Sequence, residues 1–444
     1  MIQTIRNAWK VQELRNKLLF TIFALLIFRV GAAIPVPFID SNTLQAYMEA
    51  QSASIFGLLN VMSGDAFAYG TVFALSIQPY INSSIIIQLL TIAIPALERL
   101  AREGGEEGKK KIAAITRYVT VAIALIQAFG YYTLIRSAGV ISAEGVWPAI
   151  VIIAAFTAGS AFVMWLGEQI TEFGVGNGIS IILFAGIVAR GPGMVSSMIN
   201  GVTNWANGTS GESALTLHPA FIPLIIVGIL LLVIFIVFIT NAERRIPVQY
   251  AKRVVGRKMY GGQSTFIPIK VNGSGVLPLI FAFALLSFPT MIFSFFPDWS
   301  FTAWWTKYMT AEGGHWVGNV VYLFFLTLFI FLFAFFYSQI QFNPAEVSKN
   351  IQQNGGFVPG IRPGKETADF LARTVRRITF WGAVFLAIMA LLPSTVFQII
   401  NSGATDLLNA FSATGMLIVV SVALEFNKAL ENQIMMRHYK GFLK

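Results

Sequence analysis

Ten long apolar stretches dominate this chain and limit what it can fold into. Each stretch is near the roughly 20 residues that a helix needs to cross a hydrocarbon layer about 30 Å thick. Charged residues make up only 12% of the 444 residues, about half the share found in soluble proteins. We therefore expect an all-α polytopic membrane protein with spans at residues 18–33, 72–96, 113–135, 147–168, 178–199, 219–240, 275–296, 317–340, 377–397 and 407–426.

Basic residues fall almost entirely on one side of this ten-span topology. When the loops are assigned to alternating sides, the segments of one side carry 4, 6, 0, 7, 6 and 4 Lys or Arg residues in chain order. The other side has only Arg136, Arg190 and Lys307, and Arg29 lies in the first span. Lys and Arg are enriched in cytoplasmic loops, so we expect a cell-membrane protein with both termini in the cytoplasm.

Ten spans can form two halves of five, here residues 1–196 and 197–444. An odd number of spans per half inverts the second half, so a pseudo-twofold axis would lie in the membrane plane. Pro79 and Pro278 give a weak hint of this symmetry, since each follows a Gly-rich turn early in its span. Inverted halves also occur in secondary transporters, which makes such a transporter the alternative function.

Ionisable residues argue against that alternative. Ion-coupled carriers usually hold ionisable groups at mid-membrane, whereas Glu98, Glu168, Glu172 and Glu425 all lie near the ends of predicted spans. A saturable, gradient-driven uptake of a small solute would distinguish a carrier from a passive channel.

Catalytic and metal-binding patterns are missing from the sequence. There are no cysteines, and the histidines at 218, 315 and 438 are far apart and outside the spans. The run Gly104–Lys109 resembles a phosphate loop but is one residue short, and Lys110 stands where Ser or Thr is needed. We therefore expect no enzyme activity, no metal and no cofactor.

The stretch from Gly57 to Leu90 joins a short, glycine-broken segment to a spanning helix. A non-spanning segment is tolerated at membrane depth only where protein or a water-filled cavity surrounds it. Ile77, Ile81 and Ile85 recur every four residues and predict one apolar stripe. Such a stripe is equally typical of a packed or lipid-facing helix, and polar residues beside it can simply bond neighbouring helices.

Two long basic loops, 241–272 and 342–376, separate the later spans. Orientation alone explains basic loops, but loops this long are usually functional or disordered. In the second loop, the turn pairs Pro359-Gly360 and Pro363-Gly364 bracket Arg362 and predict that it lies on a defined tip. Such a tip suits RNA phosphates or acidic groups of a protein partner.

Four motifs, in this order, together resemble the SecY family, the central subunit of the Sec protein-translocation channel. They are Pro79–Leu90, Trp165–Ser180, Gln263–Asn272 and Gly356–Gly364. The resemblance implies ten transmembrane helices in two inverted five-helix halves around a central pore. It also implies a function: translocating unfolded polypeptides across the membrane and releasing transmembrane segments laterally.

The resemblance further implies roles for particular residues. The pore ring corresponds to Ile77, Ile81, Ile179, Leu183, Ile280 and Ile418. The plug, at about 58–68, corresponds to Leu58, Leu59, Val61, Met62, Ser63, Gly64, Asp65 and Phe67, of which Asp65 departs from the small residues usual there. The lateral gate helix carries Asn82, Ser84 and Gln88.

Partners follow from the same resemblance. The two long loops are expected to dock the ribosome, through its RNA and the proteins near its exit tunnel, or the SecA motor. The basic residues concerned are Arg257, Lys258, Arg362 and Lys365. Small membrane subunits SecE and SecG, signal peptides, nascent chains and the lipid bilayer complete the expected partners.

Overall fold

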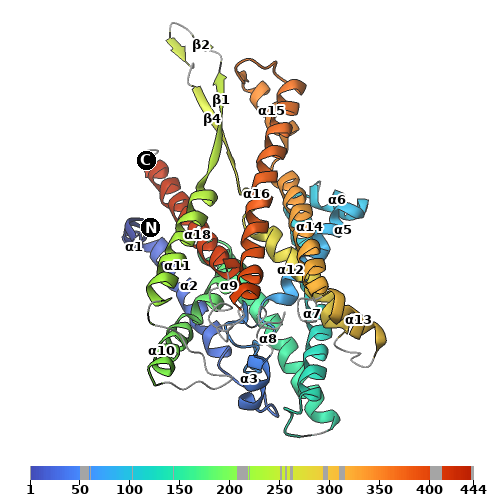
Figure 1. Cartoon of the computed structure of the whole chain (residues 1–444). Helices are drawn as coiled ribbons and strands as arrows, with labels where there is room; N and C mark the ends of the chain where they lie inside the picture. Colours follow the sequence, from blue (N-terminus) through green and yellow to red (C-terminus); the bar gives the residue numbers. More distant parts are fainter. Residues whose placement is uncertain are drawn as a thin grey trace. The chain divides into compact units, whose positions relative to one another are not determined.

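The fold was analysed in a computed structural model of the whole chain (Figure 1). It describes residues 2–50, 60, 62–102, 104–143, 145–207, 219, 221–250, 253–255, 258–260, 264–293, 299–309, 316–400 and 413–441. Leu58, Leu59 and Val61 of the expected plug lie outside these residues, as does Arg257 of the expected docking loop.

Ten helices of the described chain correspond to the ten predicted spans. They are α2 (Gln12–Gly31), α5 (Gln78–Ala93), α7 (Gly105–Ser137), α8 (Val146–Phe173), α9 (Gly178–Ala189), α11 (Phe221–Asn241), α12 (Leu277–Phe293), α14 (Trp316–Gln341), α16 (Lys365–Ile400) and α18 (Ala413–Gly441). Shorter helices are α1 (Ile2–Trp9), α3 (Ser41–Ala50), α6 (Pro95–Arg102), α10 (Gly191–Asn207), α13 (Ser300–Met309) and α15 (Pro344–Gln353).

Length and composition allow four helical segments of the described chain to cross a membrane individually, namely α7, α8, the segment that contains α14, and α16. The pair α5 and α6 provides a fifth if counted as one span, although it is bent by 106°. The bend lies at Ile94 and Pro95, where proline interrupts the backbone ladder. Three further apolar helices are shorter and fall in α9, α11 and α12.

Two predicted spans were wrong in detail. The second was expected at 72–96, but residues 72–77 form turns and the helix begins at Gln78. Pro79 explains this start, since proline is tolerated in the first helical turn, where its missing N–H has no partner anyway. The fifth, expected at 178–199, is broken at Arg190, which caps α9 before α10 begins.

The chain forms two compact units, which cut across the predicted halves. Unit 1 contains residues 1–229, 283–322 and 393–444, and unit 2 contains residues 230–282 and 323–392. The division into halves at residue 196 therefore stays a prediction.

Unit 1 has an apolar core that joins α3, α7, α8 and the chain around Phe67. Tyr131 of α7 and Phe156 of α8 are fully or almost fully buried, and their rings pack 4.9 Å apart. The ring of Phe67 stacks on Tyr131 at 4.4 Å, and the Tyr131 hydroxyl donates to the Phe67 carbonyl. The short segment before α5 is thus anchored to two long helices.

The described part of unit 2 contains two small sheets that the all-α prediction did not include. Strand β1 (Glu243–Tyr250) pairs antiparallel with β4 (Ser264–Lys270) and β5 (Gly356–Phe357), and β2 (Arg253–Val255) pairs with β3 (Lys258–Tyr260). Figure 1 shows the β1–β4 ribbon extending beyond α11. Ile246 and Val248 of β1 pack with Leu371 of α16 in one buried apolar cluster, so described residues of both basic loops belong to one small domain.

Candidate functional site

The expected ring residues on α5 are buried, but not all lie on the helix. Ile81 is 4% exposed and lies in the first turn of α5. Ile77, at 1% exposure, caps the helix from the preceding turn instead of continuing the four-residue stripe. A hydrogen bond of 3.1 Å from the Ser160 hydroxyl of α8 to the Ser76 carbonyl fixes this turn.

Side chains from the turn before α5 and from α9 meet at one position of α8. A methyl group at Gly167 would lie 3.4 Å from the side chain of Ile179 and 3.5 Å from that of Ile77. It would also lie 3.4 Å from Ile182, which is completely buried and which sequence reasoning missed. The structure therefore brings together two of the expected ring residues around a helix position that has no side chain.

The remaining ring residues divide between the two units. Leu183 of α9 and Ile418 of α18 are 3% and 2% exposed, and these two helices of unit 1 are in contact. Ile280 belongs to unit 2 and is also buried, at 7% exposure.

The entries to α5 and α12 follow the same local pattern. A residue with positive φ stands two positions before each helix, Ser76 at 47° and Gly275 at 64°. Proline is the second residue of each helix, and the fourth is Ile81 in α5 and Ile280 in α12. These matched positions strengthen the hint of symmetry that the two prolines gave in the sequence.

The described part of the expected plug contacts the C-terminal end of α9. The Asp65 carboxylate lies 2.9 Å from Nε of Arg190, the residue that caps α9. Burial raises the pKa of the Asp65 carboxyl, and the Arg190 guanidinium opposes that shift. Gly64 has φ +67°, and a methyl group there would lie 2.8 Å from the Gly186 carbonyl oxygen. Glycine is needed at this close backbone contact.

The same segment also contacts α2 and itself. Arg29 Nη1 donates a 3.0 Å hydrogen bond to the Gly64 carbonyl. Ser63 is 1% exposed, and its hydroxyl oxygen accepts a bond from the Phe67 amide. Arginines from the ends of α2 and α9 thus contact Gly64 and Asp65 of this segment.

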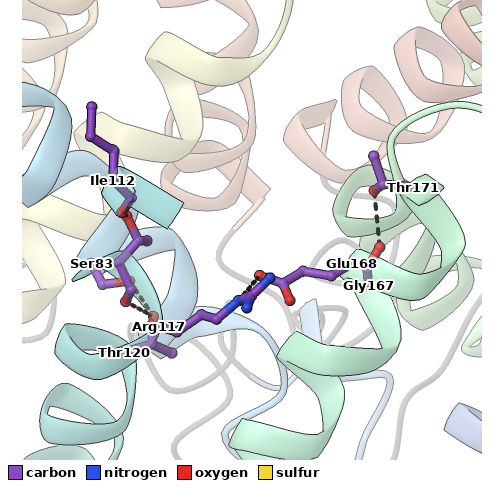
Figure 2. A network of polar contacts seen from close by, with 8 residues as sticks. Ser83, Ile112, Arg117, Thr120, Gly167, Glu168 and Thr171 are labelled. Carbon is purple, nitrogen blue, oxygen red and sulfur yellow. Dashed lines mark hydrogen bonds and ion pairs between the residues drawn. The ribbon is translucent and has the colours of Figure 1, made fainter. Parts of the chain in front are cut away.

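Polar residues on α5 have partners that the sequence did not reveal. The Gln88 amide donates to the Ser84 hydroxyl at 3.3 Å, so these two expected gate residues contact each other, while Asn82 is buried at 8% exposure. Ser83, which was not assigned a role, hydrogen-bonds the Thr120 hydroxyl of α7 (Figure 2). Ser83 therefore matches the interpretation that such residues bond neighbouring helices.

A second part of this network joins α7, α8 and α9. Arg117 Nε donates to Glu168 at 2.9 Å, as Figure 2 shows. One turn further along α8, the Thr171 hydroxyl oxygen accepts the Gly178 amide at the start of α9. The carboxylate of Glu168 is thus paired within the protein near the end of its helix.

The expected docking tip has a defined conformation. Gly360 and Gly364 have φ of 81° and 98°, which the two Pro-Gly turns predicted. Hydroxyl groups hold the tip from both sides: Ser348 donates to the Gly364 carbonyl at 2.6 Å, and Thr367 donates to the Arg362 carbonyl at 2.8 Å. Arg362 and Lys365 are both exposed. Lys258 begins β3.

Metal-binding geometry is not found in the described part of the chain, where no group of three His, Cys, Asp or Glu residues could hold an ion.

Comparison with known proteins identifies the family. The family model named SecY matches residues 71–427. The chain belongs to the SecY family. Curated relatives named protein translocase subunit SecY include one from Streptomyces coelicolor, 41% identical over the full length of both chains. Another, from Thermotoga maritima, is 41% identical and covers all of this chain and 98% of the relative.

Solved SecY and Sec61 channels have the same fold. One, described as a protein conducting channel, aligns with a TM-score of 0.66 at 17% identity, covering 94% of this chain and 92% of its own. A SecY structure described by its plug domain gives 0.63, and canine Sec61 in a ribosome–channel complex gives 0.62, with the same coverage. This chain is a multi-pass membrane protein that forms the channel of a protein translocase, and its family is not one of catalytic enzymes.

Proposed function

We propose that the six aliphatic residues of the predicted ring close the polypeptide path of this channel. The observation that carries the proposal is the convergence of Ile77 and Ile179 on Gly167. The matched positions of Ile81 and Ile280 at the fourth residue of their helices support it independently.

A ring of this composition suits a substrate of varying sequence. An extended chain rising about 3.4 Å per residue has roughly nine residues inside a 30 Å layer, and those residues differ for every substrate. Aliphatic side chains make no directional bonds, so they close around any sequence without holding it. An empty apolar constriction also loses its water, which resists ion leak.

The segment that ends at Phe67 acts as the plug in this proposal. Its support is the set of contacts from α2, α7 and α9 that hold a short non-spanning segment among long helices. On the adjoining helix, Asn82, Ser84 and Gln88 contribute to a lateral gate, where a hydrophobic segment partitions into lipid. An h-region of about ten Leu-like residues gains roughly 3–6 kcal/mol there, whereas one central charge costs about 3 kcal/mol.

Arg257, Lys258, Arg362 and Lys365 form the docking surface in this proposal. The support is the ordered tip that exposes Arg362 and Lys365 and the structural likeness to a channel described in complex with a ribosome. The partners are the ribosome or the SecA motor, and SecE and SecG are the small membrane subunits. Both termini lie in the cytoplasm of a bacterial cell, in agreement with the distribution of basic residues.

The ring is tested with Ile81→Ser and Ile418→Ser in one chain, reconstituted with its partner subunits. Polar side chains offer water a partner in the constriction, so the ion conductance of the idle channel should rise. Export of proteins with defective signal peptides should rise too, because less binding energy is needed to open the channel.

The matched control is Ile126→Ser on α7, where the side chain is 45% exposed. This variant should leave idle conductance unchanged. The idle conductance of the Ile81 and Ile418 double variant could instead equal that of the control at equal membrane abundance. These two residues would then have a role in ordinary helix packing and would not close the path.

A further inference from the structure

Two arginines from different helices bind two adjacent residues of the plug segment. Arg190, at the C-terminal cap of α9, pairs with the Asp65 carboxylate at 2.9 Å. Arg29, in the last turn of α2, donates to the carbonyl of the preceding residue, Gly64, at 3.0 Å. Both cations stand where the negative end of a helix dipole favours them, so α2 and α9 present fixed positive charge to this segment.

The surroundings make the ion pair stronger than a surface pair. The side chains of Arg190 and Asp65 are only 20% and 33% exposed. Partial burial reduces the screening by water that makes most surface pairs weak. The Asp65 carboxylate also accepts a 3.0 Å hydrogen bond from the Asn60 amide, which orients it.

The backbone conformation of Asp65 also supports a role for its carboxylate. Asp65 has φ +70°, a conformation that glycine adopts at no steric cost. Asp tolerates this region better than most residues, yet the local fold does not require a carboxylate there. The carboxylate of Asp65 therefore acts through its contacts with other residues. Its ion pair with Arg190 connects it to α9.

We propose that Arg190 and Arg29 are positioning residues that latch the plug to α9 and α2, and that separation of Asp65 from Arg190 sets how readily the channel opens. This inference rests on the proposed function of the segment as the plug. Opening moves a carboxylate away from a half-buried guanidinium, so the pair stabilises only the closed state.

The test is a double-mutant cycle with Asp65→Asn and Arg190→Gln in the reconstituted translocase. Asn has the shape of Asp and tolerates positive φ, so the first variant removes the charge alone. A cysteine introduced at Ser63, where the native chain has no cysteine, reports plug displacement through its rate of labelling by a membrane-impermeant thiol reagent. Idle ion conductance is measured in parallel.

Each single variant should speed the labelling roughly tenfold, between the effects expected for exposed and for buried pairs. The double variant should add little to either single one, because both remove the same contact. Asp40→Asn is the matched control: it removes an exposed carboxylate that bonds only the start of α3 in the contacts recorded for it, and it should leave the labelling unchanged.

The outcomes distinguish a failure of the proposed latch from a failure of the proposed sealing role of the plug. Faster labelling with unchanged conductance supports the latch but contradicts the sealing role of the segment. Labelling that stays at the native rate in both single variants, at equal membrane abundance, overturns the latch even if the Ile81 and Ile418 variants leak. Effects that simply add in the double variant also overturn it, since independent residues would behave that way.

Discussion

Replacing Gly186 by alanine should displace the proposed plug segment without changing the sequence of that segment. Gly186 lies inside α9, and a methyl group there would lie 2.7 Å from the Met62 carbonyl oxygen of the plug segment. Ordinary contact begins near 3.4 Å, so the carbonyl must retreat by about 0.7 Å. Overpacking of this kind typically costs about 1–3 kcal/mol.

That cost applies only while the segment around Met62 is seated against α9. Alanine also stabilises the interior of a helix by about 1 kcal/mol relative to glycine, but it does so whether the plug is seated or displaced, and the gain cancels. The ratio of displaced to seated plug should therefore rise about 5- to 150-fold, since 1.4 kcal/mol is tenfold. The labelling rate of a cysteine at Ser63 should rise by the same factor.

Gly228→Ala supplies the control for this experiment. Gly228 is also inside a helix, α11, and no described atom would lie within 4 Å of the added methyl group. It reproduces the helix stabilisation without the clash, so labelling should stay at the native rate. A native rate in Gly186→Ala as well would refute the reasoning, because the plug would then not rest on α9.

Three other perturbations have defined outcomes. Ser76→Gly should raise the free energy of unfolding by about 1–2 kcal/mol, measured by thermal denaturation, because it relieves a positive φ and removes a buried hydroxyl that has no hydrogen-bond partner among the described residues. Arg362→Glu should weaken motor or ribosome binding at unchanged membrane abundance, whereas Lys349→Glu on the nearby helix should not. If both variants bind equally well, the basic residues of this loop serve only to orient the chain in the membrane. Hydrogen bonds from Thr43 and Asn42 lower the pKa of the Asp40 carboxyl, so its stabilisation of α3 is present above the ordinary pKa and is lost as the pH falls below about 4. Amide exchange in α3, corrected for intrinsic rates, should show that loss in the native chain and not in Asp40→Asn.

The sequence predicted the spans well because hydrophobic length is a strong signal. It failed where backbone geometry replaced hydrophobicity as the deciding factor. Residues 72–77 are as apolar as the helix that follows, and only their turn conformation separates them from α5. The strands of unit 2 were missed because Glu243–Tyr250 carries too many charges to stand out as a strand.

The candidate site, too, could be predicted only in part from the sequence. The buried isoleucines were predicted from their resemblance to a family, and the structure adds the surface against which two of them pack. Gly167 could not be chosen from the sequence, because its role lies in the absent side chain. The pairing of Asp65 with Arg190 joins residues 125 positions apart, and in a single sequence nothing links them.

The bend between α5 and α6 brings the chain that follows α5, the helix of the proposed lateral gate, against the start of α7. A methyl group at Gly108, in the first turn of α7, would lie 2.0 Å from the Leu100 carbonyl of α6, so the two backbones touch there. The hydroxyl pair of Ser83 and Thr120 joins α5 itself to α7. These contacts hold α5, α6 and α7 together, so an outward movement of α5 in the proposed lateral gate would carry α6 and α7 with it.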